Sequence, residues 1–218
     1  MKKTCAEKSF FWNPFILQGT TTINFLDEKQ FLADLRAQKR DAYAKLLEAY
    51  EKMVFNTCLS FVPNVQDAED TAQEVFIEVY NSISKFKGNS KLSTWIYRIA
   101  VNKSLAFIRK KSAKKRFGFM QSITGNTIPM DKSSYFTEFN HPGVQMERKE
   151  EQETLFYAIN QLPEGQKVVF TLHKIDGLSY KEVSEITKKS ISSVESLLFR
   201  ARKNLKQILT EYYKKEGW

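Results

Sequence analysis

Apolar residues recur at intervals of three and four over two long blocks of the chain, a spacing typical of helices that bury one face. The first block spans residues 27–111, and the second begins near Arg148 and continues to about residue 210. Between the blocks this periodicity fades, and Gly, Ser, Thr, Asn and Pro become frequent. Only eight glycines and five prolines occur in 218 residues, which favours long helices over a turn-rich sheet. We therefore predict an all-α fold with two small helical domains, an N-terminal helical bundle and a C-terminal helix-turn-helix, joined by a flexible linker.

The predicted boundaries follow from these changes in periodicity. We place an N-terminal extension at 1–24, the helical bundle at 25–112, the linker at 113–147 and the helix-turn-helix domain at 148–213. Within the bundle we expect two helices between residues 27 and 61, broken around Lys39 to Asp41. A turn at Pro63 and Asn64 then precedes a third helix from Asp67. A fourth helix is expected over residues 93–111.

The third helix has two distinct faces. One apolar stripe is predicted to face the core and consists of Ala68, Ala72, Val75, Val79 and Ile83. The opposite stripe consists of Asp70, Gln73, Glu74 and Ile77. Such an acidic stripe is usually only solvated, but an apolar residue within a polar surround favours a protein interface.

The second block contains the pattern of a helix-turn-helix. Ser179 followed by Glu182 forms a capping-box signature at the start of one helix. A turn over residues 188–190 follows, and either Ser190 or Ser192 is placed to cap the next helix. In this motif the early residues of the second helix meet base edges in the major groove. That helix offers Ser192, Ser193, Glu195, Ser196, Phe199, Arg200, Arg202, Lys203 and Lys206. The alternative is an ordinary helical hairpin with a solvated basic face.

The charge of the chain favours a polyanionic partner. Its net charge is +9 and its predicted pI is about 9.4, which suits nucleic acid or an anionic membrane. Seven basic residues and no acidic residue lie between Lys103 and Arg116. On charge alone, a basic protein without such a partner is an equal alternative.

Metal, cofactor and enzyme sites are not indicated. Two cysteines, Cys5 and Cys58, and two isolated histidines provide neither a disulfide framework nor a zinc-ligand cluster. We find no nucleotide-binding loop or catalytic triad, and we expect no enzyme, no cofactor and no small-molecule substrate. The cysteine usage suits the reducing cytoplasm. The apolar run in residues 10–17 is too short to span a bilayer and contains a proline, so we assign it to the extension.

Two segments carry a family resemblance. Residues 67–111 read DAEDTAQEVFIEVYNSISKFKGNSKLSTWIYRIAVNKSLAFIRKK, and the later segment contains LPEGQKVVF followed by GLSYKEVSEITKKSISSVESLLFRARKNLK. In this order they resemble the two DNA-reading domains of bacterial RNA polymerase sigma factors of the extracytoplasmic-function class. The resemblance implies a promoter-selecting subunit that binds core RNA polymerase and promoter DNA and acts in the cytoplasm. An anti-sigma factor is expected as a further partner on family grounds alone.

The resemblance of the first segment implies roles for particular residues. The polymerase-binding residues would be Asp70, Gln73 and Glu74, with Ile77 or Phe76 adding apolar area. The loop that reads and melts the minus-ten element would form a base pocket from Gly88, Asn89, Ser90, Lys91, Ser93 and Thr94. Trp95 would support this pocket, although a tryptophan here is equally expected in a core. The helix that follows would face DNA through Arg98, Asn102, Lys103 and Arg109.

The second segment resembles the domain that reads the minus-thirty-five element. Base contacts would come from Ser196, Phe199 and Arg200, with Ser179, Tyr180, Arg202 and Lys203 on phosphates. This chain has Glu195 and Leu197 where the family often has basic residues, and Lys189 where its turn often has glycine. These departures bear on base preference rather than on the fold.

Two other classes of function stay open at this point. A stand-alone helix-turn-helix regulator would bind duplex DNA without polymerase, with the N-terminal bundle as a sensor or dimerisation domain. A helical adaptor, whose basic faces are merely solvated, would show no salt-sensitive DNA binding.

Overall fold

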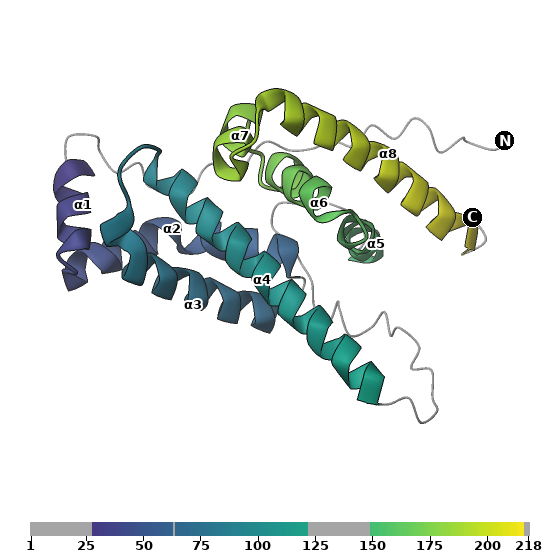
Figure 1. Cartoon of the computed structure of the whole chain (residues 1–218), viewed down its shortest axis with the longest axis horizontal. Helices are drawn as coiled ribbons and strands as arrows, with labels where there is room; N and C mark the ends of the chain where they lie inside the picture. The colour runs from purple at the N-terminus through teal and green to yellow at the C-terminus, as the bar shows by residue number, and fades with distance from the viewer. Residues whose placement is uncertain (1–27, 63, 122–148, 216–218) are drawn as a thin grey trace.

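The computed structural model describes residues 28–62, 64–121 and 149–215. The N-terminal domain comprises α1 (Glu28–Arg36), α2 (Arg40–Phe61), α3 (Val65–Ser82), the short η2 (Ile83–Lys85) and α4 (Leu92–Gln121). The C-terminal domain comprises α5 (Lys149–Asn160), α6 (Glu164–Phe170), η4 (Thr171–Ile175), α7 (Tyr180–Thr187) and α8 (Ile191–Lys215). Regular structure in the described ranges is entirely helical, which confirms the predicted all-α, two-domain fold (Figure 1). The predicted N-terminal extension and residues 122–147 of the predicted linker lie outside the described residues.

Helices α2, α3 and α4 pack together to form the core of the N-terminal domain. The apolar stripe predicted for α3 is confirmed, because all five of its residues are buried. The helix begins at Val65, two residues before the predicted start, because the Asn64 side chain accepts a hydrogen bond of 2.9 Å from the Asp67 backbone N–H. The predicted break between the first two helices is also confirmed, with α1 ending at Arg36 and α2 beginning at Arg40.

Helix α4 extends beyond the predicted end at Lys111 and continues to Gln121. The predicted end was wrong because it was placed where the apolar periodicity stops. Apolar periodicity indicates only a buried face, and residues of high helix propensity can continue a helix that has no buried face. Alanine, lysine and arginine, which fill residues 113–116, are among the strongest helix formers. The first part of the segment assigned to the linker is therefore helical, and the domain boundaries themselves stay a prediction.

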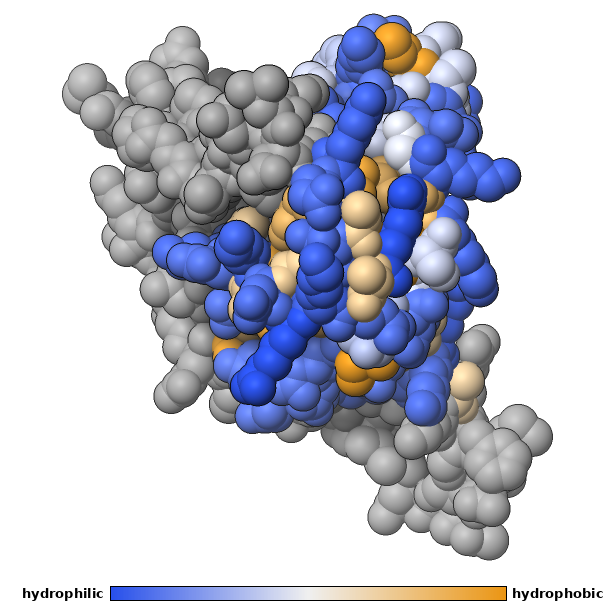
Figure 2. All heavy atoms as spheres, turned by 90° about the vertical axis from the view of Figure 1, so that its left-hand side faces the viewer, coloured by the Kyte–Doolittle hydropathy of each residue, from blue (hydrophilic) through white to orange (hydrophobic). Residues whose placement is uncertain are grey.

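One face of the molecule can be described from its side chains. The face on the α1 side of the molecule is covered mainly by hydrophilic residues, with small apolar areas between them (Figure 2). In the described part of the chain, no helix is both long and apolar enough to cross a membrane.

The two domains contact each other directly. Helix α4 packs against α7, and α2 packs against η4, so that the buried apolar residues of both domains form one continuous cluster. Figure 1 shows α7 beside the N-terminal half of α4. The Arg98 side chain of α4 donates hydrogen bonds to the backbone oxygens of Glu185 (2.8 Å) and Ile186 (3.2 Å) in the last turn of α7. The C-terminal end of a helix carries partial negative charge, so it suits a guanidinium.

A buried carboxyl group lies at the centre of this contact. Asp176, which follows η4, places its two oxygens 3.4 Å from the Thr57 hydroxyl and 3.2 Å from the Ser60 hydroxyl, both on α2. Each hydroxyl has a single hydrogen, and a backbone oxygen of its own helix competes with Asp176 for it at a shorter distance. Burial raises the pKa of the Asp176 carboxyl to about 7, and the two hydroxyls offset only part of that effect. The neighbouring Cys58 thiol and Tyr97 phenol also have raised pKa values because of burial, and Asp176 adds to both shifts.

We predict that Asp176 makes the free energy of unfolding fall as pH rises. Its pKa is raised in the folded state, so the stability that it contributes is complete below about pH 4 and is lost as pH increases through about 7. The Asp176→Asn variant should lack this decline, which should amount to a few kcal/mol at most in the wild type. Urea denaturation at about pH 5 and about pH 7.5 measures the difference. Other titrating groups, such as His173, contribute equally to the free energy of unfolding of both proteins, so their effects cancel when the two are compared. The same change with pH in the wild type and in Asp176→Asn would contradict the prediction.

Candidate nucleic-acid and protein interfaces

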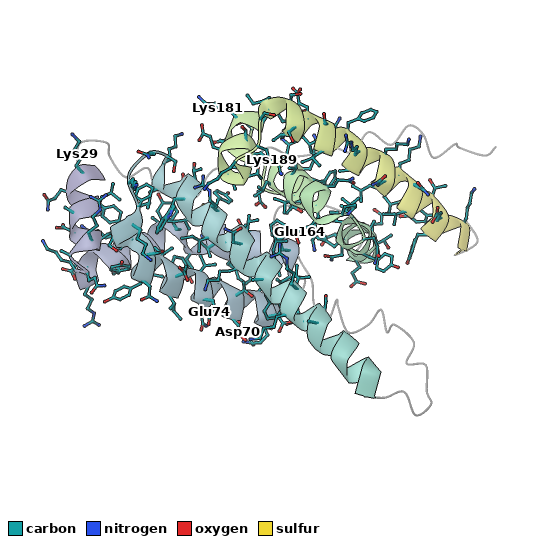
Figure 3. All side chains as sticks on the ribbon, in the orientation of Figure 1. Lys29, Asp70, Glu74, Glu164, Lys181 and Lys189 are labelled. Carbon is teal, nitrogen blue, oxygen red and sulfur yellow. The ribbon has the colours of Figure 1, made fainter. Side chains whose placement is uncertain are left out.

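The acidic face of α3, defined as Asp70, Gln73, Glu74 and Ile77, is exposed along its whole length. Ile77 is 55% exposed although it is a large apolar residue. Figure 3 shows that Asp70 and Glu74 lie on the side of the bundle that faces away from α5–α8. Phe76 is not part of this face, because its side chain is partly buried and packs against the core. Of the two apolar residues expected to add contact area, the structure therefore places only Ile77 in the acidic face.

Sequence reasoning missed an apolar extension of this region. Tyr80 follows Ile77 by three residues on α3, and its ring centroid lies 4.7 Å from that of Tyr43 on α2. Tyr80 and Leu47 are both exposed. The available signal was the adjacent pair Leu46 and Leu47, because neighbouring helical residues cannot both face one core. Leu46 is fully buried and Leu47 is therefore directed outward.

The loop before α4 has the geometry that its glycine allows. Gly88 adopts a φ of +75°, a conformation that side-chain-bearing residues rarely adopt. Asn89 and Lys91 are exposed, whereas Ser90 and Ser93 are half-buried. Thr94 is only 4% exposed, so its side chain faces the core rather than the loop surface. Thr94 is the third residue of α4 and is buried in this arrangement, so its place in the base pocket stays a prediction.

Trp95 forms an aromatic pair beneath this loop. Its ring centroid lies 5.2 Å from that of Phe86, and the Trp95 side chain is half-buried against the core. This position is compatible with both predicted roles of Trp95, as a support for the loop and as a core residue.

The α4 face, defined as Arg98, Asn102, Lys103 and Arg109, has polar groups of other helices close by. Lys103 lies 3.6 Å from Glu74 and 3.2 Å from Glu78, which joins the α4 face to the acidic face. Arg109 makes a two-point contact with Glu164 at the start of α6, whose side chain lies between α6 and α4 in Figure 3. Asn102 is exposed. Two of the three cations of this face, Arg98 and Arg109, therefore bond to the C-terminal domain.

The helix-turn-helix is assembled by local caps. Ser179 and Glu182 form the predicted capping box, in which the Ser179 hydroxyl accepts from the Glu182 N–H and the Glu182 carboxylate accepts from the Ser179 N–H. Ser190, rather than Ser192, caps α8 by accepting a hydrogen bond of 3.2 Å from the Ser193 N–H. Lys188 ends α7 in the left-handed conformation with a φ of 55°. The strained residue of the turn is therefore Lys188. It lies one position before Lys189, which stands where the turn of the family often has glycine.

One exposed row of α8 carries most of the predicted base and phosphate contacts. We call this row the α8 face; it consists of Ser192, Glu195, Ser196, Phe199, Arg200, Arg202 and Lys203. Phe199 is 71% exposed, the highest value among the large apolar residues that the structure describes. The opposite side of α8 is buried through Val194, Leu198, Ala201 and Leu205.

Three residues near the α8 face are partly buried rather than exposed. Ser193 is half-buried, and Leu197 packs against the core, so the apolar departure at Leu197 does not alter the exposed row. Tyr180 is also half-buried, with its ring centroid 4.6 Å from that of His173. Sequence reasoning did not assign a role to Lys181 or Lys189, which are exposed at α7 and the turn (Figure 3). Their positive charge beside a recognition helix was the available signal.

Comparison with known proteins decides the family. Residues 46–114 match the family described as Sigma-70 region 2, and residues 152–205 match Sigma-70, region 4. The ECF RNA polymerase sigma-E factor of Escherichia coli K12 is 31% identical over 169 residues, covering 77% of this chain and 87% of the relative. The chain belongs to the extracytoplasmic-function sigma factors. The RNA polymerase sigma-H factor of Pseudomonas aeruginosa is 27% identical over 182 residues, covering 84% of this chain and 93% of that relative.

Solved structures share the fold of this sigma factor. CnrH in complex with the cytosolic domain of CnrY aligns with a TM-score of 0.58 and 17% identity, over 84% of this chain and 97% of that chain. The sigma factor RpoE in complex with the anti-sigma factor NepR from Bartonella quintana aligns with a TM-score of 0.50 and 20% identity, over 85% of this chain and 95% of that chain.

The function follows from membership of the family. The chain is an alternative sigma factor that initiates transcription, and sigma factors bind core RNA polymerase and promoter DNA. They are initiation factors rather than enzymes in themselves. Because both sigma regions are present in this order, a stand-alone helix-turn-helix regulator is not favoured.

We predict that Lys188→Gly stabilises the sigma factor by about 0.5–1 kcal/mol. Glycine adopts a positive φ without the steric cost that a Cβ atom imposes. Lys189→Gly is the matched control, because it removes the same charge at the next position without relieving a left-handed residue. The control should be neutral or slightly destabilising. Urea denaturation compares the two variants, and equal effects at both positions would contradict the assignment of strain to Lys188.

Proposed function

We propose that this sigma factor uses three separate surfaces in transcription initiation. The acidic face binds core RNA polymerase, the loop at residues 88–94 with the α4 face reads and opens the minus-ten element, and the α8 face reads the minus-thirty-five element. The observation that carries this proposal is the exposure of the acidic face and of the α8 face, each of which includes an exposed large apolar side chain, Ile77 and Phe199 respectively.

The acidic face suits a protein partner with positive charge. Ile77 supplies apolar area at one end, and the carboxylates of Asp70 and Glu74 flank it on the same side of α3. Interfaces combine apolar area with polar groups, and the acidic face offers both. The neighbouring Leu47 and Tyr80 would enlarge the contact with polymerase.

The loop before α4 suits single-stranded DNA. Capture of an unstacked base needs exposed polar groups beside an aromatic support, with cations nearby for the backbone. Asn89 and Lys91 supply exposed polar groups, and the Phe86–Trp95 pair lies beneath them. Arg98, Lys103 and Arg109 would provide contacts to phosphates once their present partners are replaced.

The α8 face suits the major groove of duplex DNA. Ser196 and Arg200 offer hydrogen-bonding groups to base edges, and Phe199 offers apolar contact to thymine methyl groups. Arg202 and Lys203 lie where a phosphate backbone would flank the groove. The exposed lysines Lys181 and Lys189 would add phosphate contacts from α7 and the turn.

We also propose an anti-sigma factor as a partner and the cytoplasm as the place of action. Of the two solved structures compared above, one is a complex with an anti-sigma factor and the other is a complex with the cytosolic domain of CnrY, which supports the first part. The second part follows from the location of the polymerase and promoter DNA. No catalytic role of the chain's own is proposed.

We predict that Glu74→Lys weakens binding to core RNA polymerase by at least about tenfold without loss of the fold. The change reverses a charge in the acidic face, and a buried like-charge contact at an interface costs several kcal/mol. Glu211→Lys, an exposed position on α8, is the matched control for the change in net charge. Binding to purified core polymerase is measured by fluorescence anisotropy. Wild-type affinity in Glu74→Lys would show that the acidic face is only solvated.

We predict that Arg200→Ala reduces minus-thirty-five recognition by about 1–3 kcal/mol. The measurement is run-off transcription with purified core polymerase on a promoter selected from a template library. Lys206→Ala is the control, because it removes one exposed basic residue of α8 outside the α8 face. A substituted minus-thirty-five element should depress transcription less for Arg200→Ala than for the wild type and the control. Equal promoter discrimination by all three proteins would remove Arg200 from the base-reading residues.

A further inference from the structure

The last residue of α1 is bonded to the chain just before the loop that precedes α4. The Arg36 Nη2 atom donates a hydrogen bond of 2.7 Å to the backbone oxygen of Phe86, fifty positions away in the sequence. Helix α1 also packs against η2, which ends one residue before Phe86. Between described residues, this is the only hydrogen bond that a side chain of another element makes to residues 86–91.

Arg36 is carried by a helix that is itself fixed to the bundle. Phe31 and Leu35 of α1 are buried and belong to the core, so the apolar side of this helix cannot shift without loss of packing. Arg36 directly follows Leu35 and lies in the last turn of α1, with its side chain exposed. A side chain on a packed helix holds a more constant position than one on a loop. Arg36 is therefore a firm anchor for the chain that it bonds.

The loop contains little that would fix its own conformation. A Cβ atom at Gly88 would meet no atom within 4 Å, so close packing does not determine the φ of +75° at this position. Glycine adopts positive and negative φ with similar ease, which leaves several loop conformations open. Asn89 and Lys91 are exposed and have no side-chain partner among the described residues. The restraints on the loop therefore lie at its ends.

The bond from Arg36 fixes the direction in which the chain enters the loop. The Phe86 carbonyl belongs to the planar peptide unit that joins Phe86 to Lys87, so holding its oxygen also orients the Lys87 nitrogen. The Phe86 ring, 5.2 Å from the Trp95 ring between centroids, joins the same residue to the beginning of α4. A hydrogen bond with a charged donor is stronger than one between neutral groups. The backbone and the ring of Phe86 are thus held from two different helices.

We propose that Arg36 is a positioning residue for minus-ten recognition, because its bond to the Phe86 oxygen holds the loop before α4 ready to capture an unstacked base. This inference rests on the proposed function of that loop. A binding segment that is already ordered loses less conformational entropy when its ligand binds. The match to Sigma-70 region 2 begins at residue 46, so α1 lies before the matched residues.

The test uses three single variants of the full-length chain. Arg36→Ala removes the bond to the loop and leaves the buried residues of α1 in place. Lys29→Ala is the matched control, because it removes one exposed positive charge from the same helix without touching the loop. Asn89→Ala changes an exposed side chain of the loop itself.

The measurement is run-off transcription with purified core polymerase on a promoter selected with the wild type. Two derived templates carry a substituted minus-ten or a substituted minus-thirty-five element, and the selected promoter is compared with each as a ratio of transcripts. Arg36→Ala should lower the minus-ten ratio about three- to tenfold, the range expected for loss of one charge-assisted hydrogen bond. Its minus-thirty-five ratio should equal that of the wild type, as should both ratios of Lys29→Ala.

The outcomes separate this inference from the proposed function. Urea denaturation establishes that each variant is folded under the assay conditions. A minus-ten ratio that falls in Asn89→Ala but is equal in Arg36→Ala and Lys29→Ala would overturn the positioning role and leave the proposed function intact. An equal fall of both ratios in Arg36→Ala would show a general structural role and would also overturn it. Unchanged minus-ten ratios in all three variants would overturn the proposed role of the loop.

Discussion

The packing of α4 determines where every proposed surface lies. One side of this helix is buried against α2 and α3, which fixes the acidic face of α3 on the outer side of the bundle. Another side contacts α7 and α6, so the recognition helix α8 is carried as part of a domain docked on the same helix. The loop at residues 88–91 leads directly into its first turn, which begins at Leu92. A change in the position of α4 would therefore move the protein-binding, strand-reading and duplex-reading surfaces together.

Charge is distributed unequally over this scaffold. The net charge is +9, yet the acidic face concentrates carboxylates on one side of α3. Lys103 joins the two regions, because it lies within ionic contact of Glu74 and Glu78 while belonging to the α4 face. Under the proposed function, an anionic surface would meet the protein partner and cationic surfaces would meet DNA, and neither kind of charge covers the whole molecule.

Local features of the fold were predictable from the sequence, and contacts between distant residues were not. The buried stripe of α3 and the capping box of Ser179 and Glu182 depend on residues three or four positions apart, so the sequence contains their full cause. The inward direction of Thr94 depends on how α4 docks against the bundle, which no local pattern specifies. The bonds of Arg98 to α7 join residues nearly ninety positions apart. Family resemblance predicted a DNA role for this arginine, but only the structure shows what occupies it in the free chain.

The length of α4 has a consequence for the thermodynamics of the contact between the two domains. The helix has 30 residues, so it extends for about 45 Å and carries the start of the interdomain connection well past Lys111. Because the connection is covalent, the two domains meet in a unimolecular reaction with an effective concentration set by the tether. Dilution of the protein therefore leaves unchanged the fraction of molecules in which the two domains are in contact. The fraction in contact responds instead to conditions and ligands that favour one state, such as pH, polymerase or DNA.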